Sequence, residues 1–131
     1  MKLKQYFENQ KGTGVLATAD SEGRVDAALY ARPHFMEDGT IAFIARDRLT
    51  HHNLQSNPYA AYLFVEDGRG YKGKRLFLKK VGEEKETERL YELKRREYVT
   101  DANTEEDPKY LMFFSLEKVL SLVGGQEEPI E

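Results

Sequence analysis

The chain has 131 residues, of which 40% are hydrophobic and 33% are charged, and it carries a formal net charge of −3 and no cysteine. A chain of this length suits one domain over residues 1–131. The acidic balance argues against a nucleic-acid partner, and the lack of cysteine excludes disulfides, zinc–thiolate sites and thiol catalysis.

The sequence shows no targeting or membrane segment. The opening residues, MKLKQYFENQK, lack the apolar stretch of a signal peptide. No apolar run approaches membrane-spanning length. We therefore expect a cytoplasmic protein that does not associate with membranes.

The chain is expected to open with a helix and to continue mainly as strands. Residues 2–11 carry apolar side chains at helical spacing, and Gly12 and Gly14 are expected to end that helix. The tetrapeptides DSEG at 20–23 and MEDG at 36–39 predict tight turns. Apolar runs rich in β-branched and aromatic residues predict six strands, at 15–19, 24–31, 40–45, 59–66, 75–81 and 110–123.

Two more helices are expected between these strands. Residues 50–57 give one or two helical turns, ended by an Asn-Pro pair. Residues 83–98 begin with acidic and end with basic side chains, which matches the helix dipole. We expect a polar loop over 99–109 and a frayed tail over 124–131.

The strand pattern predicts an antiparallel barrel. Tight turns make the early strands antiparallel neighbours. Residues 40–45 and 59–66 are apolar on both alternating faces, which favours a barrel with another element packed outside it. These strands carry more apolar side chains than the interior of one small barrel can bury, so we expect a homodimer.

A polar cluster lies between the strand at 40–45 and the helix after it. It contains two arginines, a threonine and the adjacent pair His51-His52. Neighbouring residues on a helix point about 100° apart, so these histidines cannot share one ion. Because no metal-binding histidine spacing occurs elsewhere, we expect no metal site.

The same turn has the chemistry of an anion site. The first backbone N–H groups of a helix lack internal partners and attract anions. Arg46 and Arg48 precede that helix, and guanidinium groups bind phosphate through paired hydrogen bonds. Thr50 would donate its hydroxyl to the anion or cap the helix. These residues alone leave a solvated turn, capped by Thr50, as an open alternative.

Two segments resemble the pyridoxamine 5′-phosphate oxidase-like, FMN-binding split-barrel family: GVLATADSEGRVDAALY and DGTIAFIARDRLTHHNLQSNPYAAYLF. Leu54 and Asn57-Pro58 stand where the family's short helix ends. The resemblance covers about residues 14–77. It implies a mainly β fold with flanking helices, a six-stranded antiparallel split β-barrel. It also implies a homodimer with one flavin mononucleotide (FMN) in each of two clefts at the interface.

The resemblance also implies which residues bind the cofactor. The flavin ring would lie against the second strand, where small side chains permit close approach. The phosphate would lie at the turn before the short helix, although Arg48-Leu49-Thr50 stands where members often have a serine, arginine and lysine. The implied FMN-binding residues are Ala27, Ala28, Leu29, Tyr30, Ala45, Arg46, Asp47, Arg48, Leu49, Thr50 and His51.

The function that follows is an FMN-dependent oxidoreductase or electron carrier of unknown substrate, with no catalytic residue identified and enzyme status open. Pyridoxamine 5′-phosphate oxidase itself is longer and has a C-terminal substrate-binding segment with arginine and histidine, whereas this sequence ends in VGGQEEPIE, so pyridoxamine 5′-phosphate oxidation is not assigned. Two alternatives stay open. One is a haem- or deazaflavin-binding barrel, in which His34, His51 or His52 would ligate haem. The other is a cofactor-free barrel.

Overall fold

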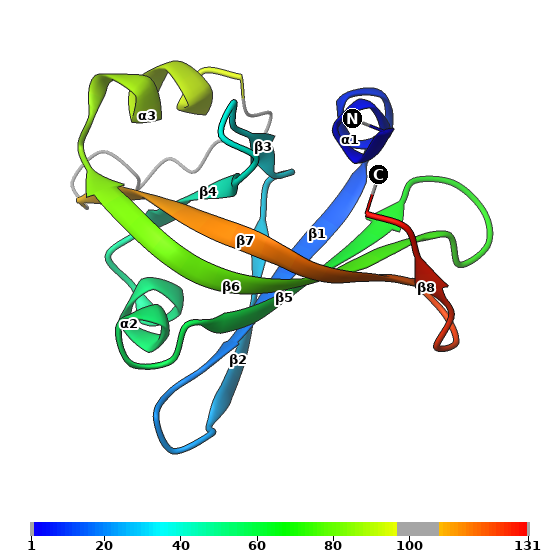
Figure 1. Ribbon diagram of the computed structural model, residues 1–131, viewed down its shortest axis with the longest axis horizontal. Helices are drawn as coiled ribbons and strands as arrows, with labels where there is room; N and C mark the ends of the chain where they lie inside the picture. The colour runs from blue at the N-terminus through cyan, green and yellow to red at the C-terminus, as the bar shows by residue number, and fades with distance from the viewer. Residues whose placement is uncertain (1, 97–107, 131) are drawn as a thin grey trace.

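The computed structural model describes residues 2–96 and 108–130 and shows a strongly curled antiparallel sheet with three helices (Figure 1). The helices are α1 (Lys2–Asn9), α2 (Leu49–Ser56) and α3 (Glu88–Lys94). The strands are β1 (Gly12–Ala19), β2 (Val25–Tyr30), β3 (His34–Phe35), β4 (Ile41–Arg46), β5 (Tyr59–Glu66), β6 (Gly73–Lys85), β7 (Lys109–Ser121) and β8 (Glu127–Glu128).

The sheet has the order β2-β1-β5-β6-β7-β4-β3, with β8 paired to β7. All of its described pairings are antiparallel. The mainly β, split-barrel prediction is confirmed, but the count of six strands is wrong. The six long strands are present, and β3 and β8, of two residues each, are too short to leave a periodic signal in the sequence.

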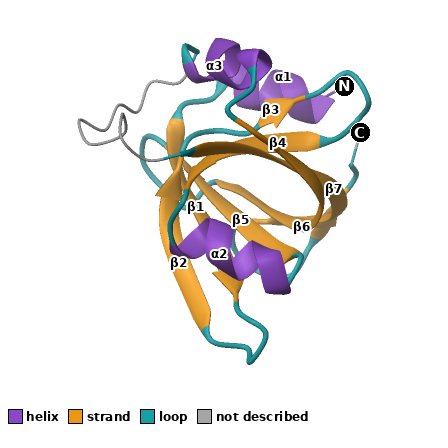
Figure 2. Ribbon diagram, turned by 90° about the vertical axis from the view of Figure 1, so that its left-hand side faces the viewer, coloured by secondary structure: helices purple, strands orange, loops and turns teal. Residues whose placement is uncertain are grey.

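The barrel is split between β2 and β4. In the described part of the chain, β2 pairs only with β1, and β4 pairs with β7 on one edge and with β3 only at Ile41 and Ala42 on the other. Figure 2 shows α2 across one end of the curled sheet, while α1 and α3 lie at the opposite end. The structure therefore has a basal end, marked by α2, and an apical end, marked by α1 and α3.

The barrel interior is filled by large side chains that alternate along the strands. Tyr62 and Phe64 point inward from β5 and are fully buried. Phe43 of β4 packs against Tyr62 and Phe114, with ring centroids 4.9 and 5.8 Å apart. Burying aromatic side chains of this size supplies most of the stability of a small domain.

The outer face of β4 is covered by α3. Leu90 and Leu93 of this helix pack with Ala42, Ile44 and Leu111 in a second apolar cluster. The expected element outside the barrel is therefore present. The apolar excess of residues 40–45 is buried inside the chain itself, so this strand gives no reason to expect a second subunit.

The first helix ends earlier than predicted, and the glycines after it belong to β1. The helix stops at Asn9, and Gly12 and Gly14 pair with residues of β5. Arg32 fixes the helix end, because its Nη1 donates to the carbonyl oxygens of Phe7 (2.9 Å) and Gln10 (2.8 Å). A cation at this end also complements the helix dipole.

The boundary between β6 and α3 differs from the prediction. Residues 83–85 were expected to start a helix, but they continue β6 and pair with Met112, Leu111 and Tyr110 of β7. The helix begins at Glu88 and ends at Lys94. The rest of the predicted helix from residue 97 and the predicted loop up to 107 lie outside the described residues. The tail forms β8 in place of the frayed end that was expected.

Candidate functional site

The turn between β4 and α2 carries the polar cluster found in the sequence. The strand ends at Arg46, and Arg48 is the N-cap of the helix, with extended backbone angles. Thr50 is the second residue of the helix, so the reading of Thr50 as its N-cap is wrong. The side chain of the N-cap residue makes no capping hydrogen bond to the backbone N–H groups of the first turn.

The first turn of α2 presents unused hydrogen-bond donors. The first backbone bond of the helix runs from His52 N to Arg48 O (2.9 Å). The N–H groups of Leu49, Thr50 and His51 precede it and have no acceptor within the helix. Thr50 is only 5% exposed, and its hydroxyl makes no hydrogen bond to any residue of the described ranges. These groups together form a donor site for an anion.

Two arginines flank this donor site. Arg46 is half-buried at the end of β4, and Arg48 is exposed. Asp47 stands between them, and its carboxylate lies 3.6 Å from Nδ1 of His51. The negative charge of Asp47 therefore faces the histidine. Among the described residues of this turn, two side chains are cationic and one is anionic, and guanidinium groups favour a phosphate group.

The side chain of His51 is buried and held in place by other residues of the fold. It is 6% exposed, and its ring stacks on Tyr110 of β7 with centroids 3.7 Å apart. Its Nε2 lies 3.1 Å from both carboxylate oxygens of Glu83 on β6 and 3.1 Å from Nε2 of Gln55. His51 thus anchors α2 to β6 and β7, and what it offers a ligand is its backbone N–H.

Glu83 is the centre of this anchor. Burial by itself raises the pKa of the Glu83 carboxyl, but hydrogen bonds from Lys80, Gln55 and His51 outweigh burial and lower the pKa from 4.5 to about 2. Its ionised form is therefore favoured in the folded protein. A carboxylate held this way stabilises the fold only while it stays ionised.

We expect Glu83→Gln to lower stability at neutral pH and to lose that effect in acid. The unfolded chain binds the proton near pH 4.5 and the folded chain near 2, so this contribution is present above pH 4.5 and fades as pH falls toward 2. After allowance for its partial exposure, we expect a loss of about 1–2 kcal/mol at pH 7. Urea unfolding at several pH values measures it.

Glu117→Gln is the matched control, because Glu117 is an exposed glutamate on β7. It should change the free energy of unfolding by less than about 0.5 kcal/mol at any pH. A Glu83→Gln deficit that stays constant from neutral pH to pH 2 would show that packing, and not the charge, causes it.

The ring-facing residues predicted on β2 lie next to this turn. Ala28 and Tyr30 face inward and are half-buried, whereas Ala27 and Leu29 face outward and are exposed. The ring of Tyr30 meets Phe43 of β4 edge-on, with centroids 6.1 Å apart. The helix α2 packs against β1, β2 and β4. The residues predicted to bind the phosphate and those predicted to face the flavin ring therefore lie at the same split of the barrel.

Ala45 is the remaining predicted cofactor-binding residue and lies on β4, directly before the turn. It is 1% exposed and belongs to the core, so its side chain faces the barrel interior. From Phe43 onward, the edge of β4 that faces away from β7 has no strand partner in the described ranges. The outer edge of β2 is unpaired in the same way. Backbone groups on these two edges are available to a planar polar ligand.

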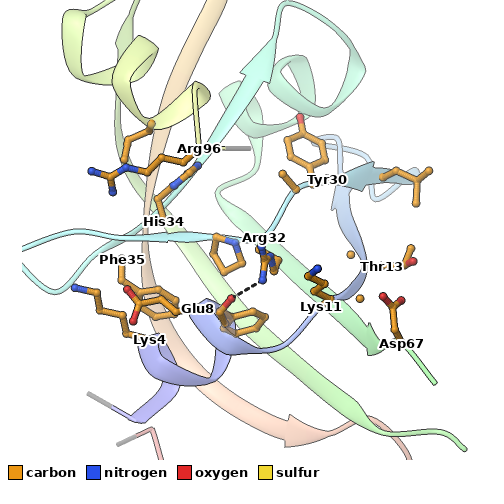
Figure 3. Close-up of a pocket in the computed structure, with 17 residues that line it drawn as sticks. Lys4, Glu8, Lys11, Thr13, Tyr30, Arg32, His34, Phe35, Asp67 and Arg96 are labelled. Atoms are coloured by element: carbon orange, nitrogen blue, oxygen red, sulfur yellow. Dashed lines mark hydrogen bonds between the residues drawn. The ribbon is translucent and has the colours of Figure 1, made fainter. Parts of the chain in front are cut away.

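Sequence reasoning missed a pocket of about 800 Å³ at the apical end (Figure 3). It is lined by α1, by the start of β1, by the chain that leaves β2 and by residues at and after α3. Leu29 and Tyr30 belong both to this pocket and to the predicted ring site. No local motif marks the pocket, because its walls come from segments far apart in the sequence.

No helix in residues 2–96 or 108–130 is long and apolar enough to cross a membrane. Within the same ranges, no three histidine, aspartate or glutamate side chains gather in a metal-binding group.

Comparison with known families and structures gives a consistent fold. The sequence profile described as "Pyridoxamine 5′-phosphate oxidase" matches residues 2–120. No curated protein matches the chain. The crystal structure of an FMN-binding protein from Syntrophomonas wolfei subsp. wolfei superposes with a TM-score of 0.71 at 19% identity, over 94% of this chain and 85% of that chain.

Two other similar solved structures are named for other cofactors. An F420 reductase superposes with a TM-score of 0.59 at 13% identity, over 88% of this chain and 94% of that one. A heme binding protein from Mycobacterium smegmatis superposes with a TM-score of 0.58 at 19% identity, over 95% of this chain and 55% of that one. At these identities, each likeness shows a shared fold.

Proposed function

The chain belongs to the pyridoxamine 5′-phosphate oxidase family, whose profile spans residues 2–120, and from this premise we propose that it is an FMN-binding flavoprotein that acts as an oxidoreductase or electron carrier. The observation that carries the proposal is the basic turn before α2. It combines two arginines with N–H groups that have no acceptor within the helix, and it lies beside the edges of β2 and β4 that have no strand partner in the described ranges.

The phosphate of FMN fits the start of α2. The N–H groups of Leu49, Thr50 and His51 would donate to its oxygens, and the helix dipole favours a dianion there. The hydroxyl of Thr50 would add a fourth donor. Arg48 would supply charge from the exposed side and Arg46 from the end of β4.

The flavin ring fits the split of the barrel. Ala27 and Ala28 have small side chains, so a planar ring can approach the backbone of β2. The unpaired backbone edges would hydrogen-bond its polar rim. Bound FMN would supply a ring that accepts and donates electrons. The protein would contribute binding, orientation and backbone dipoles that tune the ring.

The test is the absorption spectrum of the purified protein, followed by mass analysis of whatever denaturation releases. A flavin spectrum and a released mass equal to that of FMN would support the proposal. A deazaflavin mass would favour the chemistry named for the F420 reductase, and a Soret band would favour haem. If the colourless protein also fails to bind added FMN, the proposal is wrong.

We further propose a homodimer built on the outer face of β2, β1 and β5. This face carries Val25 (84% exposed), Leu29 (75%), Tyr59 (54%) and Leu63 (36%). Ala17 lies between Ala27 and Ala61 on the same face, so small and large apolar side chains form one continuous surface. A contiguous exposed apolar surface of this kind is typical of a subunit interface.

We expect the wild-type protein to be a dimer at micromolar concentration and Leu63→Glu to shift it to monomer. Leu63 lies on β5 between Val15 and Arg75, and a carboxylate introduced here would have to lose its water shell on association, which opposes dimer formation. Light scattering measures the mass. Val123→Glu makes the same change at an exposed valine beyond β7 and should stay dimeric. A monomeric wild type would refute this interface.

A further inference from the structure

The apical pocket has the size of a small-molecule site. Its volume of about 800 Å³ lies in the range typical of ligand pockets. One wall is α1, and the opposite walls come from the chain that leaves β2 and from the residues around the end of α3 (Figure 3). The pocket lies at the opposite end of the barrel from α2 and is therefore separate from the phosphate turn.

The charge of the pocket is opposite to that of the whole protein. Among the described residues that line it, four side chains are cationic and two are anionic, an excess of two positive charges, whereas the chain has a formal net charge of −3. Lys4, Lys11 and Arg96 come from three different segments, and their side chains make no ion pair with the described residues. A cleft with one sign of charge concentrates ligands of the other sign.

The inner part of the pocket is apolar. Phe7 of α1 is 3% exposed, and its ring lies 6.0 Å from that of Phe35 of β3. Pro33 is buried beside them, and Leu93 adds an aliphatic side chain from α3. A ligand that fills this pocket therefore needs an apolar body as well as an acidic group.

The pocket reaches the predicted flavin ring. Leu29 and Tyr30 line it, and these residues form the apical end of the β2 segment proposed to face the ring. We propose that the pocket binds the organic reaction partner of the flavin, an amphipathic anion with an apolar ring and one carboxylate, sulfonate or phosphate group. The identification as the reaction partner rests on the proposed flavin function, whereas the ligand chemistry follows from the pocket.

A pair of fluorescent probes tests the ligand chemistry. Anilinonaphthalene sulfonate carries an aromatic body and an anionic group, and N-phenylnaphthylamine has the same body without the charge. The double variant Lys4→Glu/Lys11→Glu should weaken binding of the sulfonate about tenfold or more. It should change the affinity for the neutral probe by less than about threefold.

Two further variants locate the binding. Lys2→Glu reverses one charge on α1 outside the pocket lining and should leave both affinities within about twofold. Thr13→Trp places a large ring at an exposed position of the lining and should weaken both probes. If Lys2→Glu equals Lys4→Glu/Lys11→Glu in effect, or if Thr13→Trp changes neither probe, the pocket does not bind such anions.

The flavin part of the proposal has a separate readout. In protein loaded with FMN, saturation with the sulfonate probe should shift the flavin absorption bands, and Lys4→Glu/Lys11→Glu should need about tenfold more probe. If the probe binds in the pocket and the bands do not move, the pocket does not hold the reaction partner. If FMN itself fails to bind while charge-dependent probe binding persists, the flavin proposal is wrong and the anion pocket stands.

Discussion

Replacing Arg48 by alanine is expected to weaken FMN binding about ten- to a hundredfold, because a charged hydrogen bond to phosphate contributes roughly 1.5–3 kcal/mol. Arg48 is exposed at the N-cap of α2, so its removal leaves the core intact. Arg46→Ala should weaken binding less, since Arg46 lies at the end of β4, two residues before the N-cap of α2. Quenching of FMN fluorescence measures both affinities.

Riboflavin and a distant arginine provide the controls. Riboflavin lacks the phosphate, so Arg48→Ala should change its affinity by less than about threefold. Arg69→Ala removes an exposed arginine from the loop between β5 and β6 and should leave FMN binding unchanged. If both Arg48→Ala and Arg46→Ala bind FMN within about twofold of wild type, the phosphate lies elsewhere.

Variants of Thr50 test the role of its hydroxyl through the same FMN and riboflavin affinities. Its hydroxyl has no hydrogen-bond partner among the described residues, although the residue is 5% exposed. Thr50→Ala should therefore lower affinity for FMN more than for riboflavin, whereas Thr50→Ser should retain both. Equal affinities for Thr50→Ala and wild type would remove this hydroxyl from the phosphate site.

Gly14→Ala is expected to destabilise the fold by about 3 kcal/mol, near the upper end for an overpacked core. A Cβ on Gly14 would lie 1.9 Å from Oη and 2.4 Å from Cζ of Tyr62. That tyrosine is fully buried, and its hydroxyl donates to Ala31 O at 3.1 Å. The ring cannot move without losing this bond and the packing around it.

Urea unfolding gives the free energy for Gly14→Ala, with Gly82→Ala as the control. A Cβ at Gly82 of β6 meets nothing within 4 Å, so this change should cost less than about 0.5 kcal/mol. In a Tyr62→Phe background the cost of Gly14→Ala should fall, because the nearest clashing atom is gone. The same cost in both backgrounds would show that the clash with the hydroxyl is not its cause.

The strand 59–66 and the helix α2 show where sequence reasoning succeeds. The predicted strand is confirmed over Tyr59–Glu66, and the predicted helix at 50–57 is displaced by one residue. Both have strong local signals: an apolar run in the first case and an Asn-Pro stop in the second. Such signals depend only on residues that are close in the sequence, so tertiary contacts rarely override the structure that they predict.

The segment 83–98 shows where local signals mislead. Its acidic start predicted a helix, but Glu83 and Glu84 lie opposite Met112 and Leu111 of β7. The ladder with β7, which the sequence does not display, outweighs the helix propensity of these residues. Residues 97–98 lie outside the described chain, so that end of the prediction has no outcome.

The candidate site also has features that local sequence signals predicted and features that they did not. The sequence identified the turn at Arg46 to His51, because charge and helix-start signals are local. It did not reveal that Glu83 and Tyr110 anchor His51, since these partners follow 32 residues or more along the chain. The apical pocket is a stronger example, because α1, β1, β3 and the end of α3 meet there only after folding.

The place of β7 between β6 and β4 has a consequence for how this protein reaches its native state. Ile41 of β4 pairs with Phe114 of β7, so within the described part of the chain β3 and β4 join the rest of the sheet only through a strand encoded about seventy residues later. Closing so long a stretch of chain costs entropy before its contacts form, and folding rates fall as contacts become less local. We therefore expect the split that the flavin would fill to take shape late, when β7 brings the edge of β4 to face that of β2.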